Sequence, residues 1–179
     1  MAGVRGAAVA GLAGTVIAVV VLAWVTQTGP VRGYVASGQV FYERDTKDSI
    51  LSSDEYTLLA RMGSEVPRDA VIAVNPWNGG ALAYAFADRK VLEFHMGQPE
   101  TKSMRVVAEA LAKADSSAGV CDAVRETKVS YALDFGQQYL LNHPSSKRYQ
   151  GLQNLESSKA VQLVYQQGAA KLYKVVACS

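Results

Sequence analysis

The chain opens with an uncharged apolar run and continues as a mixture of polar and apolar positions. The run extends from Gly6 to Val25. A helix rises about 1.5 Å per residue, so about 20 apolar residues span the hydrocarbon core of a bilayer. The pattern therefore predicts a transmembrane helix over 1–28, a connector over 29–51 and a folded domain over 52–179.

Two other interpretations of the apolar run are a cleaved signal peptide and a buried core helix. The apolar part of a signal peptide is shorter and ends near small residues in an A-x-A-like pattern. Here the run ends at Trp24 and Val25, followed by TQTGP. Aromatic residues are enriched where a retained helix meets the membrane surface. The sequence thus favours a retained anchor.

Beyond the connector, helical periods alternate with short apolar runs. Ser52 and Glu55 have the spacing of a capping box, and Pro67 ends the helix that follows. Further helices are expected over 78–87, over 101–114 and around 120–124. Strands are expected over 70–74, 90–94 and 129–135, and VQLVYQQ and KLYKVV read as a closing hairpin.

This alternation of strands and helices predicts an α/β fold. We expect a small, mainly parallel, Rossmann-like sheet flanked by helices, with a C-terminal antiparallel hairpin that adds edge strands. The carboxyl ends of the first three strands would then lie along one rim.

The charge distribution excludes one class of function and indicates an orientation. The chain has 179 residues and a net charge of +2. Arg5 and Arg32 flank the apolar run and account for this whole excess, so the domain itself is neutral. Nucleic-acid binding needs clustered Lys and Arg, and we exclude it on this ground. Arg5 and the terminal amine favour a cytoplasmic N-terminus.

Cys121 and Cys178 are the two cysteines of the chain. An even number in an exported domain indicates a disulfide, and the alternative is two buried free thiols. A disulfide would fasten the C-terminal strand to a helix. We favour it, and with it an extracytoplasmic domain.

Polar residues gather after the first predicted strand. Asn75, Trp77, Asn78, Gly79 and Gly80 follow it directly, where ligands bind in open α/β sheets. Trp77 could stack on a sugar, and the glycine N–H groups could hold an anion. The alternative, which the local sequence favours, is a tight strand-to-helix turn with Trp77 packed down. Neither a G-x-G-x-x-G fingerprint nor a Walker loop is present.

His95 follows the second predicted strand, and Asp134 ends the third. Together they could form an oriented general base, and they are the weak catalytic candidates of the sequence. No nucleophile lies in a recognisable elbow. With two distant histidines and two cysteines that we expect to be paired, neither a metal site nor a cofactor is expected.

The sequence also carries a resemblance, through PWNGGALAYAFADRKVLEFH, the strand VSYALDF and the closing GAAKLYKVVAC. These segments resemble the C-terminal extracytoplasmic domain of a family of large actinobacterial multi-pass membrane proteins. Those proteins look like polyprenyl-phosphate-sugar-dependent glycosyltransferases of the GT-C type. The similarity runs from about Ser52 to Cys178 and includes the preceding membrane helix.

The resemblance implies a role but no catalytic residue. Such enzymes carry their catalytic acid on an early external loop between membrane helices, and this chain has one expected span. It would be a detached tail domain or a truncated reading frame. We therefore expect a single-pass, non-catalytic, extracytoplasmic domain at the cell membrane. Its expected partners are the bilayer, a glycan or polyprenyl-linked sugar, and a membrane protein in envelope glycan assembly.

Two other functions stay open at this point. One is enzymatic, as part of a GT-C-like glycosyltransferase or as a hydrolase using His95 and Asp134. The other is a purely structural interaction module.

Overall fold

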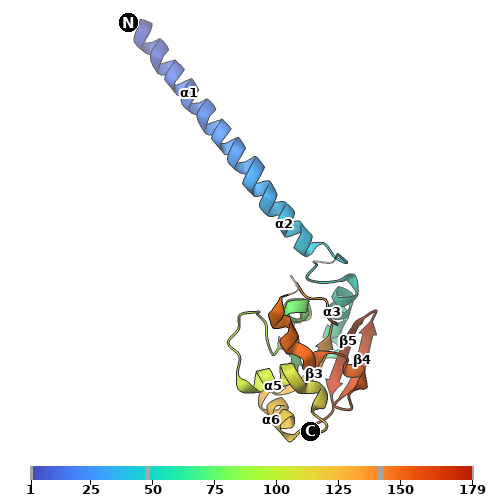
Figure 1. Cartoon of the computed structure of the whole chain (residues 1–179). Coiled ribbons are helices and arrows are strands. Elements are labelled where there is room, and N and C mark those ends of the chain that lie inside the picture. Colours follow the sequence, from blue (N-terminus) through green and yellow to red (C-terminus); the bar gives the residue numbers. More distant parts are fainter. Residues whose placement is uncertain (1, 47–48, 141–142, 179) are drawn as a thin grey trace. The chain divides into compact units, whose positions relative to one another are not determined.

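The structure, a computed structural model, describes residues 2–46, 49–140 and 143–178. The chain divides into two compact units, Met1–Phe41 and Tyr42–Ser179. The first unit is helical and the second is an α/β domain (Figure 1).

The first unit is a long apolar helix. Helix α1 (Ala2–Thr26) continues through a π-helical turn, η1 (Gln27–Val31), into α2 (Arg32–Tyr42). Residues Gly11–Gln39 are long and apolar enough to cross a membrane, and none of their most apolar window is buried inside the protein. The interpretation as a buried core helix is therefore wrong.

The predicted connector differs from the structure over its first half. Residues 29–42 are helical, although Gly29, Pro30, Gly33 and Gly38 disfavour a helix by propensity. Pro30 lies inside the π-helical turn, and such turns often accompany an interrupted hydrogen-bond ladder. The wider turn explains how the helix continues past the proline.

The second unit is built on a five-stranded sheet of order β2-β1-β3-β5-β4. Strand β1 (Val71–Ala73) pairs in parallel with β2 (Lys90–Val91) and with β3 (Val129–Asp134). The hairpin of β4 (Val161–Gln167) and β5 (Ala170–Val175) is antiparallel, and β5 pairs with β3. The predicted fold class is confirmed: the first part of the sheet is parallel and the closing hairpin is antiparallel.

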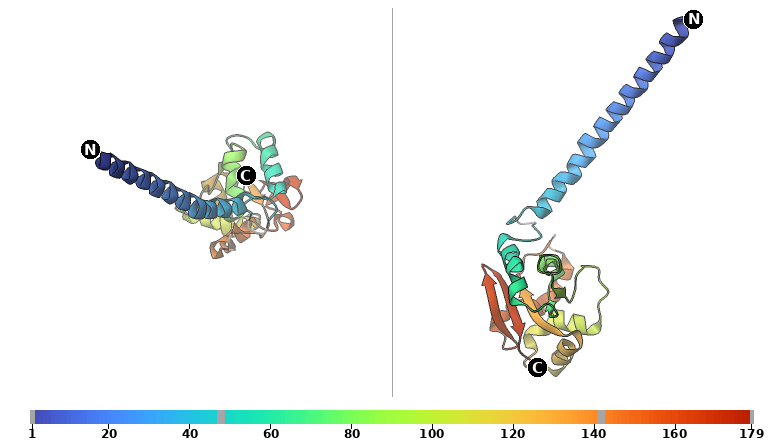
Figure 2. Two further views of the ribbon diagram at one scale, coloured as in Figure 1. Left: turned by 90° about the horizontal axis from the view of Figure 1, so that it is seen from above. Right: turned by 180° about the vertical axis from the view of Figure 1, so that it is seen from behind.

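Helices cover both faces of this sheet, because successive strand residues point to opposite faces. Ile72 and Leu133 pack with α3 (Ser53–Glu65) and α4 (Ala83–Phe86) in one apolar cluster. Ala73 and Ala132 pack with α5 (Lys102–Ala110) and α6 (Ala118–Thr127) in the other. Figures 1 and 2 show α3 on one side of the sheet and α5 and α6 on the other.

Local signals explain where these helices begin and end. Ser52 and Glu55 form the predicted capping box, with the Glu55 N–H donating to Ser52 Oγ and the Ser52 N–H donating to Glu55 Oε2. The predicted helix 101–114 is α5 followed by a 3-10 turn, η4 (Leu111–Lys113). The break lies at Ala110 and Leu111, where the backbone of Gly151 approaches the helix. A Cβ on Gly151 would lie 2.4 Å from the Ala110 nitrogen, so this close approach requires glycine.

Two predicted elements are shorter than expected. The helix expected over 78–87 is split into 3-10 turns η2 (Pro76–Asn78) and η3 (Gly80–Leu82) and the short α4, because Gly79 adopts a φ of +81° between them. The strand expected over 90–94 ends at Val91. There the Gln98 amide accepts from the Phe94 N–H and donates to the Leu92 carbonyl, which turns the chain away from the sheet.

The two cysteines are joined, as predicted. The Cys121–Cys178 disulfide connects α6 to the segment after β5, and its two cysteines are 57 positions apart in the chain. The Arg125 guanidinium also donates to the Cys178 carbonyl oxygen, at 3.1 Å. The C-terminus is therefore fastened to the helical layer on one face of the sheet.

Candidate functional site

Two cavities open at the carboxyl end of β3, on the rim that the sequence indicated. The first, here called the α3 cavity, has a volume of about 340 Å³. It lies between the start of α3, the segment that follows β3 and the β4–β5 turn, and its lining includes Ser52, Asp54, Asn78, Gly136 and Ala170. The second, here called the amide cleft, has a volume of about 520 Å³. Gln137 lines both, so the two cavities adjoin.

The amide cleft is lined almost entirely by neutral polar side chains. Its walls come from the segment after β3, from η6 (Pro144–Leu152) and from the residues before η7 (Leu155–Ser157). The lining residues are Gln137, Tyr139, Lys147, Gln150, Gln153 and Asn154. Each carboxamide offers two N–H donors and an acceptor oxygen. This combination suits a ligand whose groups both donate and accept hydrogen bonds, such as a sugar hydroxyl.

Hydrogen bonds fix the geometry of this cleft. The Gln153 amide donates to the Tyr139 hydroxyl, which ties one wall to the other. Burial raises the pKa of the Tyr139 hydroxyl, and the nearby Asp134 charge acts in the same direction. The hydroxyl therefore stays protonated and can both donate and accept.

Asp134 does not line the amide cleft but holds two of the segments that do. Its side chain is buried, with Oδ1 accepting from the Gly136 N–H at 2.9 Å and Oδ2 accepting from the Leu155 N–H at 3.4 Å. One carboxylate thus joins the end of β3 to the start of η7. Both oxygens are engaged by backbone donors, which is the arrangement of a structural carboxylate.

His95 lies elsewhere on the sheet. It is exposed in the turn after β2, where its Nδ1 accepts from the Gly97 N–H at 3.0 Å. Strand β1 separates β2 from β3, so the ends of these two strands are about 10 Å apart. Across residues 49–140 and 143–178, no hydrogen bond or ion pair joins His95 to Asp134. The structure does not bring the two catalytic candidates together.

The residues after β1 form the tight turn that the local sequence favoured. The Asn75 side chain accepts from the Trp77 N–H at 2.9 Å and is buried. One face of the Trp77 indole stacks on the His143 ring, with centroids 4.1 Å apart and planes within 6°. That face is therefore covered by protein and is not free to stack on a sugar.

Close packing explains the two glycines of this turn. A Cβ on Gly79 would lie 2.3 Å from the Ile50 carbonyl oxygen, and one on Gly80 would lie 2.9 Å from the Asn75 carbonyl oxygen. Asn78 is the member of the predicted ligand set that lines a cavity. It donates to the Gly136 carbonyl oxygen at 3.5 Å and faces the α3 cavity.

Sequence reasoning missed the amide cleft. Its residues lie in loops and 3-10 turns, which carry no periodic pattern. The available signal was compositional, since Gln137, Gln150, Gln153 and Asn154 fall within 18 residues of one polar segment.

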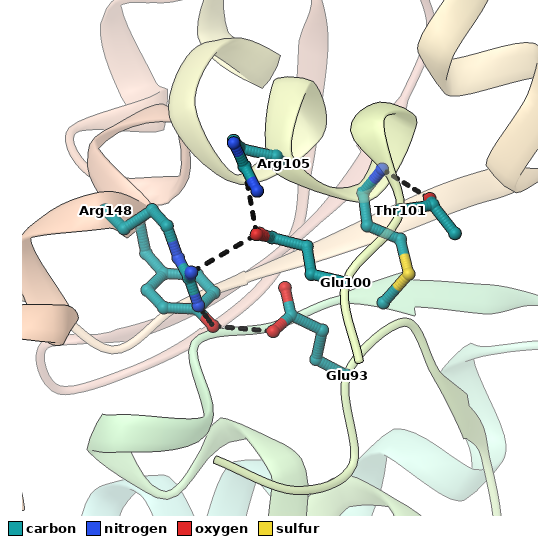
Figure 3. A network of polar contacts seen from close by, with 7 residues as sticks. Glu93, Glu100, Thr101, Arg105 and Arg148 are labelled. Atoms are coloured by element: carbon teal, nitrogen blue, oxygen red, sulfur yellow. Dashed lines mark hydrogen bonds and ion pairs between the residues drawn. The ribbon is translucent and has the colours of Figure 1, made fainter. Parts of the chain in front are cut away.

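A network of charged residues supports the η6 wall (Figure 3). Glu100 Oε2 accepts from Arg148 Nη1 at 3.2 Å and from Arg105 Nε at 3.0 Å. The buried Tyr149 hydroxyl donates to Glu93 Oε2 at 2.6 Å. Burial raises the pKa of the Glu93 carboxyl, and the hydrogen bond from Tyr149 lowers it by a smaller amount. The network fixes residues 148–149, and with them the turn that carries Lys147 and Gln150.

Comparisons with known proteins assign the family. The profile of a family of unknown function, DUF6541, matches residues 2–177. The chain belongs to this family. The match includes the apolar helix as well as the α/β domain. No curated protein matches the chain.

The solved structures include one with the same fold. It is the C-terminal globular domain of an oligosaccharyltransferase, AfAglB-S2, from Archaeoglobus fulgidus. The TM-score is 0.50 at 14% sequence identity, and the match covers 70% of this chain and 98% of that one. This similarity shows that the fold of the DUF6541 domain also occurs as the terminal domain of a glycosylation enzyme.

Proposed function

We propose that this protein is a membrane-anchored domain that binds a carbohydrate in the amide cleft and has no catalytic activity of its own. The observation that carries the proposal is the lining of the cleft, with four carboxamides and a phenol. Sugar hydroxyls both donate and accept, and these side chains can satisfy both roles.

The chemistry of the rim favours binding over catalysis. A glycosidase needs two carboxylates facing the scissile bond. Two carboxylates flank the lining residues of the amide cleft in the chain. Asp134 is buried and accepts two backbone N–H groups, and Glu156 pairs with Lys171 Nζ at 3.0 Å. The residues that line the amide cleft include no carboxylate.

The location follows from two features. The helix over Gly11–Gln39 has the length and hydropathy of a membrane span. The Cys121–Cys178 disulfide is typical of an oxidising compartment. We therefore propose that the helix anchors the protein in the cell membrane, with the N-terminus cytoplasmic and the domain outside.

The setting is envelope glycan assembly. The fold is shared with the terminal domain of an oligosaccharyltransferase. The sequence resembles the terminal domains of actinobacterial proteins of the GT-C type. We propose that the domain presents or positions a glycan, or the sugar of a polyprenyl-linked donor, for a membrane-embedded partner.

A glycan array tests the proposal. The full chain in mild detergent micelles is applied to immobilised bacterial oligosaccharides, and the affinity of the best glycan is then measured. Gln150→Ala, which removes a lining amide, should weaken that affinity about three- to tenfold, the value of one hydrogen bond. Gln162→Ala is the matched control, because Gln162 is exposed on β4 and does not line the cleft.

Each of two results would refute the proposal. One is the absence of any saturable glycan binding by a protein with native circular dichroism. The other is equal binding by the two variants.

A further inference from the structure

The amide cleft carries a single charged lining residue, and it is a cation. Lys147 lies on the η6 wall beside Gln150, among otherwise neutral side chains. The same two residues also line a neighbouring pocket of about 240 Å³, together with Glu109 and Arg148. Lys147 therefore stands where the cleft and this pocket meet.

The neighbouring arginine is already engaged. Arg148 pairs with Glu100 at 3.2 Å, and the Glu100 side chain is only 7% exposed. Arg148 also donates to the Tyr149 hydroxyl at 3.3 Å. These contacts hold the guanidinium and give it a carboxylate partner, which it shares with Arg105 (Figure 3).

Lys147 is in a different electrostatic position. In the part of the chain that the structure describes, no carboxylate oxygen lies within 4.0 Å of its ammonium group. Glu109 lines the pocket beyond it, but at a greater distance than an ion pair requires. Lys147 is exposed and lines both the amide cleft and this pocket, and the negative charge of Glu109 disfavours an anion in the pocket.

We infer that the carbohydrate bound in the amide cleft is acidic, with its carboxylate or phosphate held by Lys147. This inference rests on the proposed function and narrows its ligand to one class. The amides would bind the hydroxyls of the sugar ring, and Lys147 would donate a charge-assisted hydrogen bond to the acidic group. Glu109 would place that group on the cleft side of Lys147.

The experiment compares four probes on the full chain in detergent micelles by NMR titration, in which binding is followed through the shifts of the protein amide resonances. They are methyl glucoside, glucuronic acid, glucose 1-phosphate and inorganic phosphate. We expect the acidic sugars to bind about three- to fivefold more tightly than the neutral one, the range of an exposed ion pair. The two acidic sugars separate a carboxylate from a phosphate as the preferred group. High salt should reduce the preference for acidic sugars.

Three variants assign this preference to one side chain. Lys147→Gln should bind all three sugars alike, and Lys147→Arg should keep the preference. Lys174→Gln, which removes an exposed lysine of β5, should behave as the wild type.

The outcomes separate this inference from the function on which it rests. If neutral and acidic sugars bind equally and Lys147→Gln changes nothing, the inference is wrong and the carbohydrate site stands. Binding of inorganic phosphate as tightly as glucose 1-phosphate would show an anion site without sugar recognition, and would overturn the inference. If no sugar binds to folded protein, both proposals fail.

Discussion

Replacing Cys121 and Cys178 by serine removes the crosslink that holds the C-terminus against α6. The two residues are 57 positions apart, with Cα atoms at 5.1 Å. In the chain-entropy model, freeing a loop of this length in the unfolded state costs about 4 kcal/mol of stability at 25 °C. A domain of this size has a free energy of unfolding of about 5–15 kcal/mol. The double variant should therefore fold but with a large part of its stability lost.

Urea titration of the full chain in mild detergent, followed by near-ultraviolet circular dichroism, measures this loss. Wild-type protein with a reductant should match the double variant, and the reductant should not affect the variant further. A loss below about 1 kcal/mol would refute the reasoning. It would mean that the packing of β5 against β3 alone holds the C-terminal segment, and that the disulfide adds little.

Three further perturbations test separate parts of the structure by the same titration. Gly79→Ala places a Cβ against a backbone carbonyl at a residue with positive φ, and should lower the free energy of unfolding by about 3 kcal/mol or more. A Cβ on Gly119 would have no atom within 4 Å, so Gly119→Ala should change stability by less than about 1 kcal/mol. Asp134→Ala should lower the free energy of unfolding by about 2–3 kcal/mol, because two backbone donors lose their acceptor. His95→Ala should lower it by about 0.5 kcal/mol. Equal losses for the two variants would contradict the structural role of Asp134. Burial raises the pKa of the Glu93 carboxyl, so the folded state binds the carboxyl proton more tightly than the unfolded state does. The free energy of unfolding should therefore fall as the pH rises from the unfolded-state pKa of about 4.3 through the raised folded-state pKa. The slope is at most about 1.4 kcal/mol per pH unit. Glu93→Gln should remove this part of the pH dependence between pH 4 and 8, and an unchanged profile would show that Glu93 does not contribute.

The elements with strong local signals could be predicted from the sequence. The helix over Ser53–Glu65 has both a capping box and a following proline, and β3 is a mostly apolar run with residues of high strand propensity, Val129 and Tyr131. Each signal acts within a few residues, so no tertiary information is needed. The same holds for the hairpin, whose strands are separated by a short turn at Gly168.

Elements that depend on distant contacts could not be predicted. Strand β2 is short because the Gln98 amide takes over backbone groups of the following residues. Helix α5 breaks where Gly151, about 40 residues later, approaches its backbone. A single sequence does not show which distant residue will compete for a hydrogen bond or a contact.

The candidate site was predicted in position but not in composition. The rim at the carboxyl ends of the strands follows from the α/β pattern, and both cavities open there. The residues chosen from the turn after β1 are used mostly to build that turn, because Asn75 and Gly79 satisfy its backbone geometry. The lining amides come from irregular segments, and only the tertiary fold brings them together.

The most direct test of the central claim is to locate a bound sugar by NMR in the full chain in detergent micelles. The side-chain amide resonances of Gln150, Gln153 and Asn154 should shift and saturate together during a titration with a glycan identified on the array. Those of Gln162 and Gln166, on the exposed edge strand β4, should not move. Saturable shifts confined to β4, or a glycan that binds without shifting the cleft amides, would contradict the account.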